Sequence, residues 1–258
     1  MAFVSYAQNF EDLMLWRALS DVREGFYIDV GAGNPDLHTV TRAFYERGWH
    51  GINIEPDPAR FAELADRRDR DLNLPIALAE APGERRFHLI SVPGLSTLDS
   101  ATAFRHRARG LDVRRTKVAV STLADVCRRY APSEIHFLKI DVEGAEGAVI
   151  QGADFSAYRP WIVLAEATVP LTQVANHAAW EPILFAADYH FVWFDGLNRF
   201  YLAQEKHAAL APHFRLPPNC FDMFVIADPE KEAMAAELQA MKAELQGLGS
   251  RQERSQSD

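Results

Sequence analysis

Residues 26–33 read Phe-Tyr-Ile-Asp-Val-Gly-Ala-Gly, and residues 51–55 read Gly-Ile-Asn-Ile-Glu. The first stretch is an apolar run that stops at a glycine turn, and the second is an apolar run that stops at an acid, with a helix-like segment between them. This order is typical of a nucleotide-binding βαβ unit. Gly31 and Gly33 allow the backbone to approach a ligand closely, and Glu55 is placed to bind both hydroxyls of a ribose. The two stretches therefore predict that the chain binds a nucleoside cofactor.

The rest of the chain continues this alternation of strands and helices. Strands are expected over residues 25–30, 51–55, 74–78, 84–90, 117–121, 135–140, 161–165, 190–194, 199–203 and 222–227, with 117–121 at a sheet edge. Helices are expected from a capping box at Ser5, over residues 35–48, 61–68, 101–109, 122–130 and 178–187, and from Gly144 onward. The pattern predicts an α/β fold with a mostly parallel sheet and an antiparallel, strand-rich C-terminal end.

Composition narrows the class of protein further. The chain has 258 residues, of which 48% are hydrophobic, and this suits one α/β domain with a substantial core. A net charge of -9 disfavours nucleic acid as a partner, because phosphate backbones repel an acidic surface. The two cysteines, Cys127 and Cys220, lack the spacing of a zinc or disulfide framework. Without a signal-peptide pattern or an apolar run long enough for a membrane span, we expect a cytoplasmic protein.

The chain is expected to divide into three parts. Residues 1–228 form a single domain whose first helix covers the cofactor, and residues 249–258 are polar and expected to be disordered. Between them, apolar residues repeat at alternating spacings of four and three, at Met234, Leu238, Met241, Leu245 and Leu248. This short heptad pattern predicts a helix over residues 229–248 that either packs on the domain or joins two copies of the chain.

The choice of cofactor depends on Asp36, which stands where the dinucleotide fingerprint has its third glycine. A carboxylate at the start of the predicted helix would repel a pyrophosphate, so NAD and FAD are disfavoured. S-adenosylmethionine fits better, because it carries sulfonium and ammonium charges and no phosphate. Asp29 is then placed below its amino acid part, Glu80 flanks its adenine, and Gln8 closes over it. Asp29 could instead brace the glycine turn, and Gln8 could only cap its helix.

Several segments resemble the FkbM-type methyltransferases. They are Ser5–Asp12 with 26–33, Thr41–Trp49 with 51–56, the motif Leu138-Lys-Ile-Asp-Val-Glu-Gly-Ala-Glu146 with Val149–Gly152, and, for a bacterial branch, Phe194–Tyr201 with Pro217–Asp222. The resemblance covers residues 3 to 228, and its Lys-Ile-Asp-Val-Glu-Gly element is specific. The segment Gly33-Asn34-Pro35 departs from the family pattern, because in many members the asparagine is followed by one variable residue and then a glycine.

The resemblance implies a class I, Rossmann-like fold with a mostly parallel seven-stranded sheet and helices on both faces. It also implies S-adenosylmethionine-dependent O-methylation of a saccharide or another small hydroxylated acceptor. The branch that this chain resembles is often linked with the synthesis of cell-surface polysaccharide.

Carboxylates follow the predicted strands at one edge of the sheet, where ligands bind in open α/β folds. They are Asp29, Glu55, Asp141, Glu143 and Glu166. Asp141 is expected beside the cofactor's methyl group, as a base or as the group that orients the acceptor, with Glu143 and Glu166 as further catalytic candidates. Lys139 is expected to pair with one of the acids.

Two structural alternatives stay open for these acids. Glu143 could cap the helix that follows it. Asp141 and Glu166, with an amide such as Asn198, could hold a divalent metal that acidifies the acceptor hydroxyl.

Two other classes of function compete with a methyltransferase. A nicotinamide-dependent oxidoreductase is disfavoured by Asp36. A non-catalytic interaction protein would keep the cofactor fold as a scaffold and bind a partner through the heptads. The presence of Asp29, Gly31, Gly33, Glu55 and Asp141 argues against loss of cofactor binding, though not against loss of turnover.

Overall fold

The computed structural model describes residues 2–228, so the predicted heptads and the C-terminal tail lie outside the described residues. The chain divides into two compact units, Met1–Phe224 and Val225–Asp258. Every element below lies in the first unit, except strand β12 (Phe224–Ile226), which begins at that unit's last residue.

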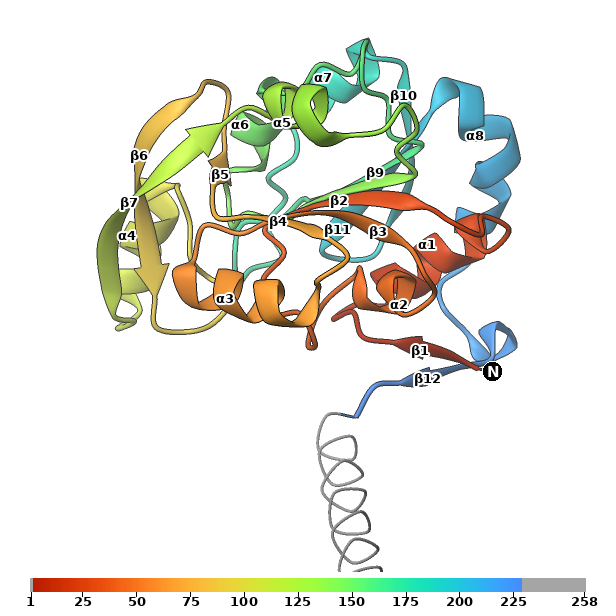
Figure 1. The fold of residues 1–258 in the computed structure, drawn as a ribbon, viewed down its shortest axis with the longest axis horizontal. Coiled ribbons are helices and arrows are strands. Elements are labelled where there is room, and N and C mark those ends of the chain that lie inside the picture. The colour runs from red at the N-terminus through yellow and green to blue at the C-terminus, as the bar shows by residue number, and fades with distance from the viewer. Residues whose placement is uncertain (1, 229–258) are drawn as a thin grey trace, which may run out of the picture. The chain divides into compact units, whose positions relative to one another are not determined.

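A seven-stranded sheet forms the centre of the first unit (Figure 1). Its strands, in spatial order, are β10 (Tyr189–Phe194), β11 (Asn198–Ala203), β9 (Ile162–Glu166), β8 (Phe137–Ile140), β2 (Phe26–Val30), β3 (His50–Ile54) and β4 (Leu72–Leu74). The run from β9 to β4 pairs in parallel, whereas β11 is antiparallel to both of its neighbours. The sheet is therefore mixed, and the predicted antiparallel C-terminal end is confirmed.

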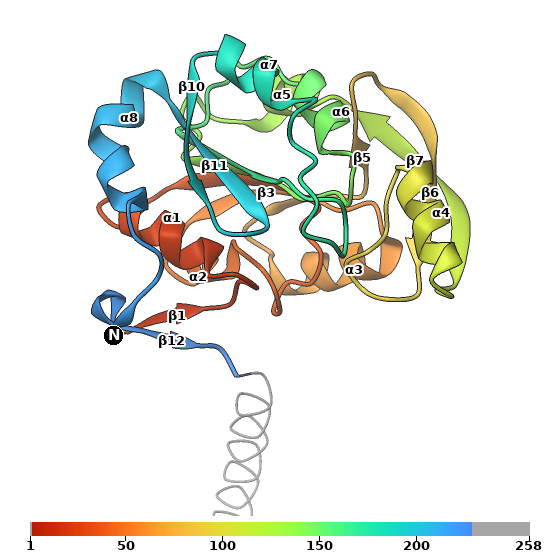
Figure 2. The same ribbon diagram turned by 180° about the vertical axis from the view of Figure 1, so that it is seen from behind.

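Helices cover both faces of this sheet (Figures 1 and 2). They are α1 (Glu11–Leu19), α2 (Arg42–Tyr45), α3 (Pro58–Arg67), α5 (Leu123–Tyr130), α6 (Glu146–Gln151), α7 (Glu181–Ala186) and α8 (Gln204–Leu210), with short 3₁₀ turns at Ala211–Phe214 and Cys220–Asp222. Successive strand residues point to opposite faces. Ile28 therefore packs in the core beneath α5 and α7, whereas Tyr27 packs in the core beneath α1 and α2.

A second, three-stranded sheet stands beside the first (Figure 1). It consists of β5 (Ala77–Leu78), β7 (Val113–Ser121) and β6 (Gly83–Ile90), with β7 in the middle, and helix α4 (Ser100–Ala108) packs against it. The prediction of one strand over 74–78 is therefore wrong, because the segment divides between the two sheets. Pro75 stands at the division and has no N–H to donate to a strand partner. The predicted edge position of 117–121 is also wrong.

The predicted capping box at Ser5 is wrong as well. Ser5 ends strand β1 (Phe3–Ser5), and α1 begins only at Glu11, after Phe10 in a left-handed conformation. The buried carboxylate of Asp12 explains the difference. It accepts hydrogen bonds from Ser5 Oγ and from the backbone N–H of Tyr6, both at 2.7 Å. These bonds hold the segment before α1 against Asp12 in a non-helical conformation.

Most of the helix predicted over 35–48 is absent, and only α2 is helical there. The side chain of Asn34 accepts hydrogen bonds from the backbone N–H groups of Asp36 and Leu37, which makes a turn in place of a first helical turn. Asp36 therefore caps no helix, and its carboxylate pairs with Arg67 at 2.8 Å. The argument against a pyrophosphate that rested on a helix start at Asp36 loses its basis.

Candidate functional site

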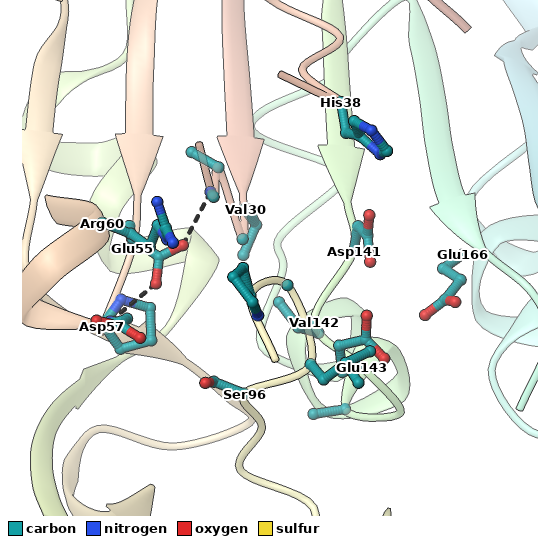
Figure 3. A pocket seen from close by; sticks show the side chains of 18 of the residues that line it. Val30, His38, Glu55, Asp57, Arg60, Ser96, Asp141, Val142, Glu143 and Glu166 are labelled. Atoms are coloured by element: carbon teal, nitrogen blue, oxygen red, sulfur yellow. Dashed lines mark hydrogen bonds between the residues drawn. The ribbon is translucent and has the colours of Figure 1, made fainter. Parts of the chain in front are cut away.

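A cavity of about 870 Å³ opens at the carboxyl ends of β2, β3, β8 and β9. The residues at or directly after those ends all line it, namely Gly31, Glu55, Asp141 and Glu166. Figure 3 shows Glu55, Asp141 and Glu166 around the cavity. The cavity has the size of a small-molecule or cofactor site and the place that ligands take in open α/β sheets.

The remaining walls come from three other parts of the chain. Apolar side chains of the second sheet and its loops, such as Leu78, Phe87 and Leu95, form one wall. Gln8, before α1, lines the cavity, and so does the segment 171–173 after β9. Residues of the loop 92–98 line the cavity too, whereas no sequence pattern had singled out the segment 171–173.

The glycine turn and Glu55 are built as one unit. Gly31 has φ +78, and a Cβ there would lie 1.8 Å from the carbonyl oxygen of Asp141, so only glycine fits this close approach. The carboxylate of Glu55 accepts a hydrogen bond from Gly33 N at 2.9 Å and another from Asp57 N at 2.8 Å. Burial raises the pKa of Glu55 to about 7.

Asp29 lies beneath this turn and does not line the cavity. It is the register partner of Lys139 on the neighbouring strand, and Lys139 Nζ lies 3.2 Å from its Oδ1. The same ammonium donates to the carbonyl of Gly31 at 2.9 Å and lies 3.6 Å from Asp141 Oδ2. Asp29 thus braces the turn through Lys139, and the predicted pairing of Lys139 with the acids is confirmed.

Three carboxylates converge on the opposite side of the cavity from Glu55 (Figure 3). One oxygen from each of Asp141, Glu143 and Glu166 lies within 4.8 Å of the others. Burial, with the charge of Asp141 as the next cause, raises the pKa of Glu143 to about 9 and that of Glu166 to about 11. Burial and mutual repulsion thus make these carboxylates hold a proton more strongly than free carboxyl groups do, and a positive charge beside them would oppose that shift.

Glu143 does not cap the helix that follows it, so that alternative is wrong. Helix α6 has no side-chain cap, and the carboxylate of its first residue, Glu146, accepts hydrogen bonds from the N–H groups of Val142 and Gly144 in the preceding loop. Glu143 adopts a left-handed conformation, with φ +57, which turns its side chain toward the cavity. Strain of this kind is common at functional sites.

Two other residues considered from the sequence lie elsewhere. Glu80 is outside the cavity lining, and its carboxylate binds Arg85 at 2.6 Å, which lowers its pKa. The amide of Asn198 donates to Glu11 and Asp195, so it joins α1 to the β10–β11 hairpin and is not among the lining residues.

The cavity and its acids fall within a known family domain. A family model described as the methyltransferase FkbM domain matches residues 29–191. No curated protein matches the chain in a sequence search. Among residues 2–228, no helix combines the length and apolar character needed to cross a membrane. Because the match spans more than half of the chain, and includes Gly31, Glu55, Asp141 and Glu166, the protein belongs to the FkbM methyltransferase family.

Proposed function

We propose that this protein is an S-adenosylmethionine-dependent O-methyltransferase that acts on a hydroxyl of a saccharide or another small hydroxylated acceptor. The observation that carries the proposal is the shared cavity. The glycine turn with Glu55 lies at one side of it, and the cluster of Asp141, Glu143 and Glu166 lies at the other.

The charges that line the cavity favour a cationic cofactor. Its acids are Glu55, Asp57, Asp141, Glu143 and Glu166, whereas its strong bases are Arg60 and Lys139. Lys139 already pairs with Asp29 and Asp141, and Arg60 pairs with Glu63 at 2.6 Å. A sulfonium and an ammonium suit such a lining, whereas a pyrophosphate would meet few cations that are not already paired.

The chain's own residues divide the work of binding and reaction. We assign Gly31, Gly33 and Glu55 to the nucleoside, with Glu55 accepting hydrogen bonds from the ribose hydroxyls, and Gln8 to the outer side of the cofactor. Bound S-adenosylmethionine supplies an electrophilic methyl group.

At the other side of the cavity, Asp141 orients the acceptor hydroxyl and takes up its proton, and Lys139 holds Asp141 in place. Glu143 and Glu166 bind the acceptor's neighbouring oxygens. A protonated carboxyl can donate to such an oxygen, and an ionised one can accept from a hydroxyl.

The sheet supports a class I, Rossmann-like assignment through its parallel run from β4 to β9 and the reversed β11. A cytoplasmic location, a role in cell-surface glycan synthesis and a homo-oligomer through residues 229–248 stay predictions from the sequence.

The test separates binding from methyl transfer. Calorimetric titration should give binding of S-adenosylmethionine and none of NAD, and radiolabelled methyl transfer to a panel of sugars should identify an acceptor. Asp141→Asn should then lower methyl transfer by about 10²–10⁴-fold, the usual contribution of a general base. Glu24→Gln, at an exposed acid before β2, serves as the control. Binding of NAD alone, or full methyl transfer by Asp141→Asn, would refute the proposal.

A further inference from the structure

The proposed function does not account for the close approach of three carboxylates, those of Asp141, Glu143 and Glu166. Asp141 follows β8 and Glu166 ends β9, which are neighbouring parallel strands, so their side chains meet at one edge of the sheet. The left-handed turn at Glu143 brings the third carboxylate to them. Figure 3 shows the three groups turned toward a common space.

Within the described residues, two of these carboxylates have an oxygen that nothing on the chain satisfies. Glu166 is only 5% exposed, and its Oε2 is buried without a hydrogen-bond partner. Glu143 Oε2 is also buried and unpartnered. Lys139, the base next to the cluster, is paired with Asp29 and Asp141.

A buried carboxylate without a partner is costly, and positive charge from a ligand removes that cost. Donors made only of carboxylate oxygens select hard divalent cations such as Ca²⁺, Mg²⁺ and Mn²⁺. Oxygens on opposite sides of a Ca²⁺ ion lie about 4.6–5.2 Å apart, since each Ca–O bond is about 2.3–2.6 Å long. The oxygens of the cluster all lie within 4.8 Å of one another, which is close enough for one ion, either Ca²⁺ or the smaller Mg²⁺, to contact all three.

We propose that Asp141, Glu143 and Glu166 bind one hard divalent cation. The cation would present its remaining coordination positions to the cavity, where hydroxyl oxygens of a saccharide can occupy them. This second statement rests on the proposed function, whereas the cation site itself does not.

The test is calorimetric titration of the full chain, after removal of metals with a chelator, with Ca²⁺, Mg²⁺ and Mn²⁺ in turn and without S-adenosylmethionine. We expect one site per chain for at least one of these ions. Glu166→Gln and Glu143→Gln should each weaken binding by more than the roughly 10–100-fold that loss of an outer-shell partner costs. Glu24→Gln makes the same change at an exposed acid and should leave the affinity unchanged. Circular dichroism of each variant checks that it is folded.

Two results would overturn the cation site: no binding of any of the three ions by the folded protein, or binding that both Glu166→Gln and Glu143→Gln retain in full. A separate titration with S-adenosylmethionine keeps the two proposals apart. Cation binding without cofactor binding would support the site and refute the proposed function. Cofactor binding without cation binding would refute the site alone and assign the acids to the cofactor or acceptor.

Discussion

Replacing Lys139 by methionine should destabilise the protein strongly, because one ammonium holds three groups together. Its side chain is only 8% exposed, and it contacts the Gly31 carbonyl at 2.9 Å, Asp29 at 3.2 Å and Asp141 at 3.6 Å. Burial by itself would lower the pKa of Lys139, but the charges of Asp29 and Asp141 raise it overall, so the pair is ionic. Without the ammonium, Asp29 is fully buried and has no cation beside it.

Breaking a buried ion pair from one side costs about 3–5 kcal/mol. In a domain of this size 1 kcal/mol moves the unfolding midpoint by about 2–4 °C, so Lys139→Met should lower it by about 6–20 °C. Urea unfolding followed by tryptophan fluorescence gives the free energy of unfolding directly.

Lys117→Met is the matched control. Lys117 makes a shorter contact, 2.6 Å to Glu84, but its side chain is 77% exposed, so its loss should cost at most about 1 kcal/mol. The double variant Lys139→Met with Asp29→Asn removes the stranded charge and should recover much of the loss. The reasoning fails if Lys139→Met costs no more than Lys117→Met, or if the double variant is less stable than the single one.

Three further outcomes follow from the site and its surroundings. Glu55→Gln should weaken S-adenosylmethionine binding about tenfold or more, since a hydrogen bond to a charged group contributes about 1.5–3 kcal/mol. Because the pKa of Glu55 is about 7, the affinity of the natural protein for S-adenosylmethionine should decrease as the pH is lowered below 7. If calorimetry finds no such decrease, Glu55 does not bind the ribose. Gly31→Ala should unfold at a lower temperature than Gly110→Ala, although both have φ near +80 to +90, because only the first meets a backbone carbonyl; equal midpoints would contradict the close approach. Burial, with the charge of a nearby aspartate, raises the pKa of Glu11 from 4.5 to about 7, so its contribution to stability is full below about pH 4.5 and is lost as the pH rises through about 7. Glu11→Gln should therefore flatten the decline of the unfolding midpoint over this range, whereas Glu24→Gln, at an exposed acid, should keep the natural slope.

The sequence predicts the elements whose signal is local. The dense apolar runs that become β2, β3, β8 and β9 end at glycine or at an acid, and the structure has strands at all four. Thr122 was expected to begin a helix, and its side chain does accept the N–H of Asp125 at the start of α5.

Features that depend on long-range pairing or on one side chain's hydrogen bonds were missed. Residues 74–78 carry no local signal that Leu78 belongs to a second sheet, because its partner there, Ser121, lies far along the chain. The turns that Asp12 and Asn34 impose also replace helices that the apolar pattern favours.

The site was predictable in kind and less so in detail. Acids at strand ends meet at one edge of a parallel sheet, and this placed Asp141 and Glu166 together from the sequence. The part that Glu143 plays depends on its left-handed backbone and could not be read from residue order. For Asp29, the sequence left a choice between the cofactor and the glycine turn, and its contact with Lys139 places it at the turn.

The second sheet has a consequence for how this enzyme family can diversify. Residues 75–121 lie between two strands of the main sheet, β4 and β8, and contain the whole second sheet, and they supply the wall of Phe87 and Leu95 to the cavity. Gly31, Glu55 and Asp141 all lie on the main sheet's edge and outside that segment. The chain is thus modular: a change confined to that segment would reshape this wall of the cavity and leave in place Gly31, Glu55 and Asp141, to which we assign the cofactor and the acceptor's proton.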